Sequence, residues 1–183
     1  MQTFEDVARL AAQLPKVTEG VDKHRKTNLT WEVGGKAFAW ERPFSKADIK
    51  RFGDQAPPTG PILAIRTADL AEKEAILAAN QDAFFTIPHF NGYAAYLVQL
   101  DKVTEQGLQE ALIDGWLAVA PRNLAERFLN RLSSDTPPRR AGRPPGQAFP
   151  PCRQARRLAA GRLTASERGP GSRMRSGARF RSR

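Results

Sequence analysis

Residues 29–41 read LTWEVGGKAFAWE, and this stretch decides the fold class of the chain. It contains two short runs with apolar residues at alternate positions, separated by the glycine pair at 34–35. Two glycines in a tight turn permit the positive φ that a two-residue β-hairpin needs, so we predict two antiparallel strands here. The side chains expected to share a face are Leu29, Trp31 and Val33 in the first strand and Phe38 and Trp40 in the second.

A helix is predicted on the N-terminal side of this hairpin. Thr3 can cap its first turn, Asp6 lies three residues later as a capping box requires, and Pro15 closes the segment. Its apolar residues recur at helical spacing, and they are Val7, Leu10, Ala11 and Leu14. We expect the hairpin to face this helix.

The C-terminal side of the hairpin contains a short helix, a strand and a longer helix. Ser45 followed by Asp48 is a cap signature that predicts one helical turn through Phe52. The apolar residues of 61–67 predict a strand. From Asp69 the apolar spacing becomes helical, and Asn80 can end this helix.

Three further elements complete the predicted domain. The turn formers Asn91-Gly92 lead into a fourth strand over residues 93–100, and residues 104–132 predict two helices because Pro121 interrupts their pattern. The order is helix, hairpin, strand, helix, strand, helix. It predicts an α+β fold with two layers, an antiparallel sheet packed by helices.

The charge of the chain divides sharply at residue 132. Residues 1–132 hold 16 Lys and Arg against 17 Asp and Glu, a net charge of −1, whereas residues 133–183 hold 13 Arg against two acids, a net charge of +11. Because residues 133–183 are poor in large apolar groups, we predict one folded domain over 1–132 and a disordered tail. Three interpretations of this tail stay open: a tether for nucleic acid or an acidic partner, a passive extension, and out-of-frame translation of a GC-rich gene.

Several classes of protein are disfavoured by the composition. No run approaches the roughly 20 apolar residues that cross a bilayer, and Glu5 and Asp6 stand where a secretory signal needs positive charge, so we expect a cytoplasmic protein without a membrane partner.

The single cysteine, Cys152, lies in the tail. Only His24 and His89 could serve as a catalytic base, and no triad motif surrounds either. We therefore expect neither an enzyme nor a bound cofactor or metal. The acids Glu5, Asp6, Glu19 and Asp22 are interpreted as a solvated surface, since no metal-ligand spacing links them.

Four segments of the chain occur in the order of known family signatures. They are LPKVTEG at 14–20, KAFAW at 36–40, FFTIPHFNGY at 84–93 and APRNL at 120–124. Over about residues 1–130 the chain resembles the MmcQ/YjbR family, and the segment at 88–93 is the most specific part of the resemblance. The resemblance implies a frataxin-like (CyaY-like) two-layer fold, which agrees with the element order above. It also implies a DNA-binding role and supplies no catalytic residues to carry over to this chain, and the tail has no counterpart in the family.

The candidate DNA-binding residues are four cations that lie close together in the sequence. They are Arg42, Lys46, Lys50 and Arg51, of which Lys46 and Lys50 share one face of the predicted short helix. Three acids at positions 41, 48 and 54 reduce the local charge to +1. Because phosphate binding needs several unopposed cations, we expect weak DNA binding, and a solvated mixed-charge surface is the alternative.

A second candidate site lies in PHFNGY at 88–93. His89, Asn91 and Tyr93 present an imidazole, an amide and a phenol that could bind bases, a small ligand or a protein partner. The alternative is structural, because Pro88 and the Asn91-Gly92 pair form turns and the aromatic residues suit a core. Of the three tryptophans, Trp31, Trp40 and Trp116, we expect at least two to be core residues.

Overall fold

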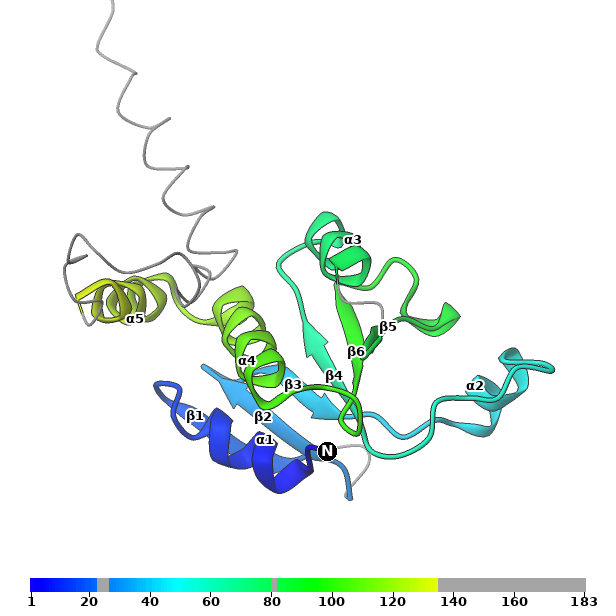
Figure 1. The fold of residues 1–183 in the computed structure, drawn as a ribbon. Helices are drawn as coiled ribbons and strands as arrows, with labels where there is room; N and C mark the ends of the chain where they lie inside the picture. The colour runs from blue at the N-terminus through cyan, green and yellow to red at the C-terminus, as the bar shows by residue number, and fades with distance from the viewer. Residues whose placement is uncertain (23–26, 80–81, 135–183) are drawn as a thin grey trace, which may run out of the picture.

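The computed structural model describes residues 1–22, 27–79 and 82–134 (Figure 1). The tail from residue 135, together with His24 and the predicted helix stop at Asn80, lies outside the described residues. The elements in chain order are α1 (Phe4–Ala11), β1 (Val17–Val21), β2 (Leu29–Val33), β3 (Lys36–Glu41), α2 (Lys46–Arg51), β4 (Ile62–Arg66), α3 (Leu70–Ala79), β5 (Phe84–Phe85), the 3₁₀ turn η1 (Pro88–Phe90), β6 (Ala95–Gln99), α4 (Glu105–Val119) and α5 (Arg122–Ser134).

The strands form one six-stranded sheet in the order β1-β2-β3-β4-β6-β5, and each neighbouring pair is antiparallel. The predicted α+β class with an antiparallel sheet is therefore confirmed, as are the hairpin at 29–41 and the two predicted strands after it. Two strands were not predicted. β1 is an edge strand whose VTEGV sequence is mostly exposed, and β5 has only two residues, so neither carries an alternating apolar pattern.

The predicted helix starts are confirmed by their caps. In α1 the Thr3 side chain accepts a hydrogen bond from the Asp6 N–H while Asp6 accepts one from the Thr3 N–H, and Ser45 and Asp48 form the same capping box on α2. The predicted break at Pro121 separates α4 from α5. Among the described helices, none has the length and apolar character needed to cross a membrane.

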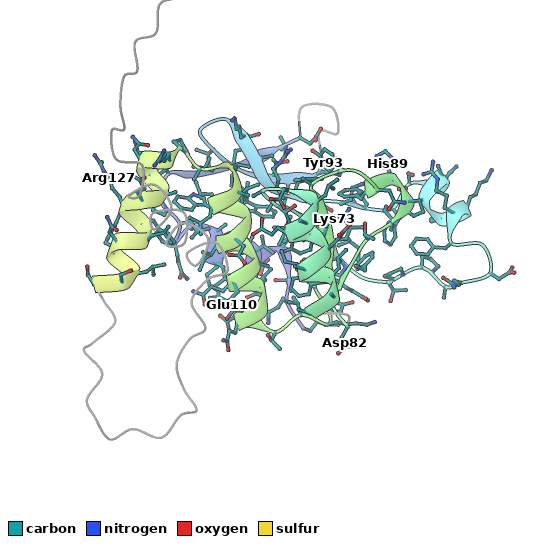
Figure 2. All side chains as sticks on the ribbon, turned by 90° about the horizontal axis from the view of Figure 1, so that it is seen from above. Lys73, Asp82, His89, Tyr93, Glu110 and Arg127 are labelled. Atoms are coloured by element: carbon teal, nitrogen blue, oxygen red, sulfur yellow. The ribbon has the colours of Figure 1, made fainter. Side chains whose placement is uncertain are left out.

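The main core lies between the sheet and the larger helices. Figure 2, seen from above, shows α5, α4 and α3 in a row on one side of the strands. Trp31 and Trp116 are fully buried in this core, and the Phe4 ring of α1 stacks on Trp31 with 6.4 Å between ring centroids. The hairpin thus faces α1, as predicted, and two of the three tryptophans are core residues.

The opposite face of the sheet carries a second, smaller apolar cluster. Its buried members are Ile62, Ala64, Ile87, Phe90, Ala95 and Leu97, with Trp40, Phe44, Phe52 and Phe85 packed against them. The Phe44 ring contacts the rings of Phe52 and Phe85, which brings the flanks of α2 beside β5. This face is therefore covered by α2 and the segment that includes η1.

One sequence prediction within the hairpin is wrong. Phe38 lies in the main core, whereas Trp40 belongs to the cluster on the opposite face. The reason is a β-bulge, since Trp31 pairs with Ala39 but Glu32 pairs with Ala37, which leaves Phe38 as an extra residue in β3. An extra residue shifts the alternation of side chains by one place, so residues on either side of it no longer share the expected face.

Candidate functional site

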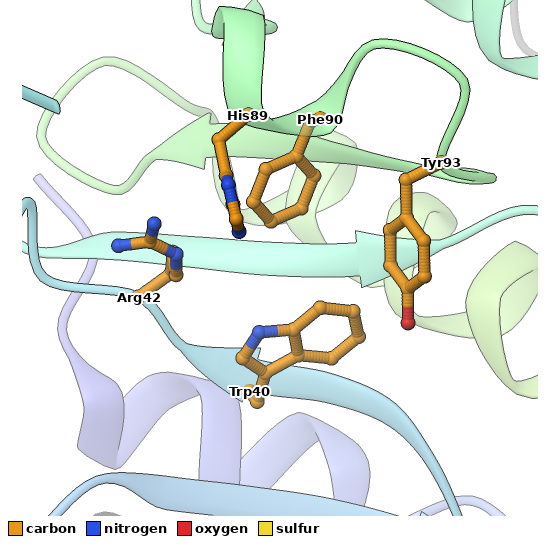
Figure 3. A pocket seen from close by; sticks show the side chains of 5 residues that line it. All are labelled: Trp40, Arg42, His89, Phe90 and Tyr93. Carbon is orange, nitrogen blue, oxygen red and sulfur yellow. The ribbon is translucent and has the colours of Figure 1, made fainter.

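A hollow of about 430 Å³ opens on the face of the sheet opposite the main core. Its lining residues are Trp40, Arg42, His89, Phe90 and Tyr93. Figure 3 shows His89 and Phe90 reaching down from η1 and Trp40 and Arg42 reaching up from β3 and its end, with Arg42 and Tyr93 at opposite ends. The hollow therefore joins two segments that lie about fifty residues apart in the sequence.

The segment over residues 87–93 is shaped by two consecutive turns. The Phe90 N–H donates to the Ile87 carbonyl (2.8 Å) and so forms the 3₁₀ turn, with Pro88 at its start. Asn91 has φ −61° and ψ 129°, Gly92 has φ +75°, and the Tyr93 N–H donates to the Phe90 carbonyl (3.0 Å). These values define a type II turn, whose third position requires a positive φ and so favours Gly92. The predicted turn at Asn91-Gly92 is confirmed.

Three aromatic rings form the apolar wall of the hollow. Trp40 and Phe90 lie nearly parallel at 22°, with 6.4 Å between centroids. Tyr93 meets both rings edge-on, at 5.7 Å from Phe90 and 6.4 Å from Trp40. Phe90 is buried and Trp40 half-buried, whereas Tyr93 is 42 % exposed. Aromatic surface is thus available to a ligand from solvent.

Arg66, at the end of β4, supports the wall from its other side. Its Nη2 donates to the Tyr93 hydroxyl (2.8 Å) and its Nε to the Ala37 carbonyl (3.1 Å). The guanidinium carbon lies 5.4 Å from the centroid of Tyr93 and 5.8 Å from that of Trp40, which is a cation–π arrangement. Arg66 was not predicted as a site residue, because it ends a buried strand and no local motif connects it to Tyr93.

Arg42 lies at the opposite end and is buried, with 8 % exposure. Its guanidinium stands 5.7 Å from the Phe90 centroid, and its Nη2 donates to Oδ2 of Asp48 (2.8 Å). Asp48 also accepts hydrogen bonds from the Ser45 N–H (2.9 Å) and hydroxyl (2.7 Å). Burial acts to raise the pKa of Asp48, but the hydrogen bonds from Ser45 and Arg42 outweigh it and lower that pKa to about 2. Asp48 is therefore ionised and fixes Arg42 in place.

The structure brings together residues from both predicted sites. Arg42 lines the same hollow as His89 and Tyr93. Lys46, Lys50 and Arg51 are exposed on α2, with Arg51 within 3.5 Å of Asp48, and they do not line the hollow. Asn91 is exposed in the turn and does not line it either.

The chemistry that this site offers is stacking and anion binding. The rings present flat apolar surface, while the guanidinium groups of Arg42 and Arg66 and the imidazole of His89 carry N–H donors. Within residues 1–22, 27–79 and 82–134 there is no group of three or more His, Cys, Asp or Glu side chains that could hold a metal ion. The acid Glu19 instead accepts a hydrogen bond from Nε1 of Trp31 (3.1 Å).

Comparison with known proteins gives relatives without an assigned activity. No family model matches the chain. A crystal structure of Deinococcus radiodurans protein DR2400, which contains a DUF419 domain, resembles it with a TM-score of 0.49 at 19 % identity, covering 81 % of this chain and 97 % of that one. Three mycobacterial proteins are each 39 % identical over 132 residues, which cover 70 % of this chain and 97 % of the relative. They are the uncharacterized proteins Rv2570 and MT2646 of Mycobacterium tuberculosis and Mb2600 of Mycobacterium bovis. The chain belongs to the same family as these mycobacterial proteins.

Proposed function

We propose that this protein is a non-catalytic module of the MmcQ/YjbR type that binds nucleic acid weakly, with an unpaired base in the hollow beside Trp40 and Tyr93. The four motif segments support the family name and the frataxin-like fold that goes with it. The observation that carries the binding function is the convergence of three aromatic rings and two guanidinium groups on one open face.

Unpaired bases suit this face better than duplex DNA does. A base can stack on an exposed aromatic ring, which contributes about 1–3 kcal/mol per base and is tolerant of sequence. The major groove of a duplex admits a helix or a two-stranded ribbon that projects from the protein surface. The five lining residues instead surround a hollow that is bounded by η1 and β3. A base that has left its stack can enter such a hollow.

The charges around the hollow support weak binding. Lys46, Lys50 and Arg51 are exposed on α2, which contacts Arg42 of the hollow through Asp48, and they could contact phosphates. Two of the nearby guanidinium groups, those of Arg42 and Arg51, already contact Asp48. Because counterion release scales with the number of phosphates neutralised, few free cations give a low affinity with a shallow salt dependence.

Substitution of the aromatic residues of the hollow tests whether nucleic acid binds there. Fluorescence anisotropy would follow binding of a short fluorescein-labelled oligothymidylate to the full chain and to the variants Tyr93→Leu and Trp40→Leu. Loss of one stacked base should weaken binding by about 5- to 140-fold. Val21→Ala is the matched control, because Val21 is 56 % exposed on β1, two strands away from β3. Any binding through the tail is common to all variants, so equal affinities for Tyr93→Leu and the unchanged chain would contradict the proposal.

A second candidate function is a small-ligand or protein-interaction module at the same surface, His89, Asn91 and Tyr93. The volume of the hollow favours it, since small-molecule sites have volumes of about 300–1,000 Å³. A competition experiment, in which thymidine monophosphate displaces the labelled oligothymidylate, distinguishes the two functions. A mononucleotide that displaces the oligonucleotide at similar concentration supports the small-ligand function, whereas a much weaker mononucleotide supports nucleic acid.

A further inference from the structure

Lys73 is a buried lysine in the first turn of α3 that is aimed at the segment beside the hollow. It is 5 % exposed, and its Nζ donates to the carbonyl of Phe90 (2.6 Å) and to that of Tyr93 (3.1 Å). Figure 2 shows Lys73 on α3 with Tyr93 and His89 close by. A single ammonium group thus connects α3 to two of the residues that line the hollow.

The two carbonyls that Lys73 contacts are the two ends of the type II turn. The Phe90 carbonyl also accepts the Tyr93 N–H (3.0 Å), and the Tyr93 carbonyl accepts the Ala95 N–H (2.8 Å). Each carbonyl oxygen has two lone pairs, so the ammonium takes the second position on both. The turn is therefore closed by its own backbone and held to α3 by Lys73.

Burying the ammonium group of a lysine to hold a turn costs desolvation free energy. Among the described residues no carboxylate forms an ion pair with Lys73, and burial lowers the pKa of Lys73 while the nearby charge of Glu74 opposes this shift. A methionine of similar length would avoid the desolvation of an ammonium group. Packing alone consequently does not account for a lysine here, whereas the two hydrogen bonds do.

We infer that Lys73 is a positioning residue for the hollow, which fixes the backbone of Phe90 and Tyr93 and thereby sets their rings against Trp40. From this backbone position the ring of Tyr93 contacts Arg66, Trp40 and Phe90. The consequence for binding rests on the proposed function, whereas the order of the turn does not, so the two can be measured separately.

The experiment compares Lys73→Met, Lys73→Arg and the control Lys102→Met in the full chain. Lys102 is exposed in the turn after β6. Amide hydrogen exchange over residues 88–95 and anisotropy with the labelled oligothymidylate are recorded for each. Lys73→Met should speed exchange over 88–95 by about 10- to 100-fold, as expected for loss of charged hydrogen bonds, and leave β2 and α4 unchanged. Lys73→Arg should restore part of the protection, because it keeps charged donors.

Each outcome decides a different claim. Unchanged exchange over 88–95, or an equal increase in every element, would overturn the positioning role. Faster exchange over 88–95 with unchanged oligonucleotide affinity would support that role and contradict the proposed function. If Lys73→Met does not fold, Lys73→Gln, which keeps a neutral donor, takes its place with the same exchange readout.

Discussion

At the scale of single residues, the ion pair between Asp48 of α2 and Arg42 of the hollow predicts how acid affects the stability of the chain. The pKa of Asp48 is about 2 in the folded chain, below its ordinary value of 3.8. The carboxylate therefore contributes stability above pH 3.8, and this contribution is lost as the pH falls from 3.8 towards 2. A shift of this size corresponds to about 2 kcal/mol.

Urea unfolding of the full chain and Asp48→Asn should test this. The free energies of unfolding should differ by about 2 kcal/mol near pH 7, and the difference should shrink towards zero as the pH approaches 2. Asp54→Asn, at an exposed acid of the same segment, should change little. A difference between Asp48→Asn and the unchanged chain that is independent of pH would show that Asp48 acts only through packing.

Gly115 allows α4 to lie close to the strands of the sheet. A Cβ at this position of α4 would lie 2.6 Å from Cγ2 of Ile65 and 3.3 Å from the carbonyl oxygen of Phe38. Alanine favours a helix over glycine by about 1 kcal/mol, but overpacking a core costs about 1–3 kcal/mol. The strand backbone at Phe38 cannot yield easily, so we expect Gly115→Ala to lower the free energy of unfolding by about 1 kcal/mol.

Thermal or urea unfolding measures this effect. Gly20→Ala is the control, because nothing lies within 4 Å of a Cβ there. A Gly115→Ala variant that is as stable as the unchanged chain would mean that α4 can move away from the sheet.

At the scale of elements, the packing of α5 rests on a few half-buried side chains. Phe128 meets Trp116 of α4 edge-on, with 5.0 Å between ring centroids, and Ala125 is the buried residue of α5. Phe128→Ala should lower the free energy of unfolding by about 1–3 kcal/mol, less than for a fully buried phenylalanine. Arg127→Ala, at the exposed neighbouring position, should change it little. Equal stability of the two variants, measured by urea unfolding, would show that α5 adds little to the core.

Elements with strong local signals were predictable. Thr3 and Ser45 are caps with an acid three residues later, and both begin helices as predicted. The bulge in β3 was not predictable, because it depends on pairing with β2 and β4 rather than on its own sequence. For the same reason, the alternation of apolar residues in β3 could not predict which face of the sheet Trp40 occupies. The aromatic wall of the hollow, to which Trp40 belongs, was therefore not predictable either.

At the scale of the whole molecule, we predict that the body of residues 1–134 folds without the arginine-rich segment at its C-terminal end. Its apolar residues form both clusters described above, and its net charge is −1. A chain that ends at Ser134 should have the same urea midpoint as the full chain. Binding of oligothymidylate by the full chain should fall more steeply with salt, because the 13 arginines after this point release counterions. A lower midpoint for the shortened chain would show that the arginine-rich segment docks on the body.

The sequence by itself determined the helix starts, the hairpin and its glycine turn, the break at Pro121 and the α+β class. It pointed to His89 and Tyr93 in one candidate site and to Arg42 in another. Caps, turns and apolar periodicity act between residues a few positions apart, so they can be detected in one chain without its fold. Only the tertiary structure decided that Arg42 joins His89 and Tyr93 in one hollow, that Arg66 contacts Tyr93 from 27 residues away, and that Lys73 holds the turn. These contacts depend on strand order, on one bulged residue and on burial, which no local pattern specifies.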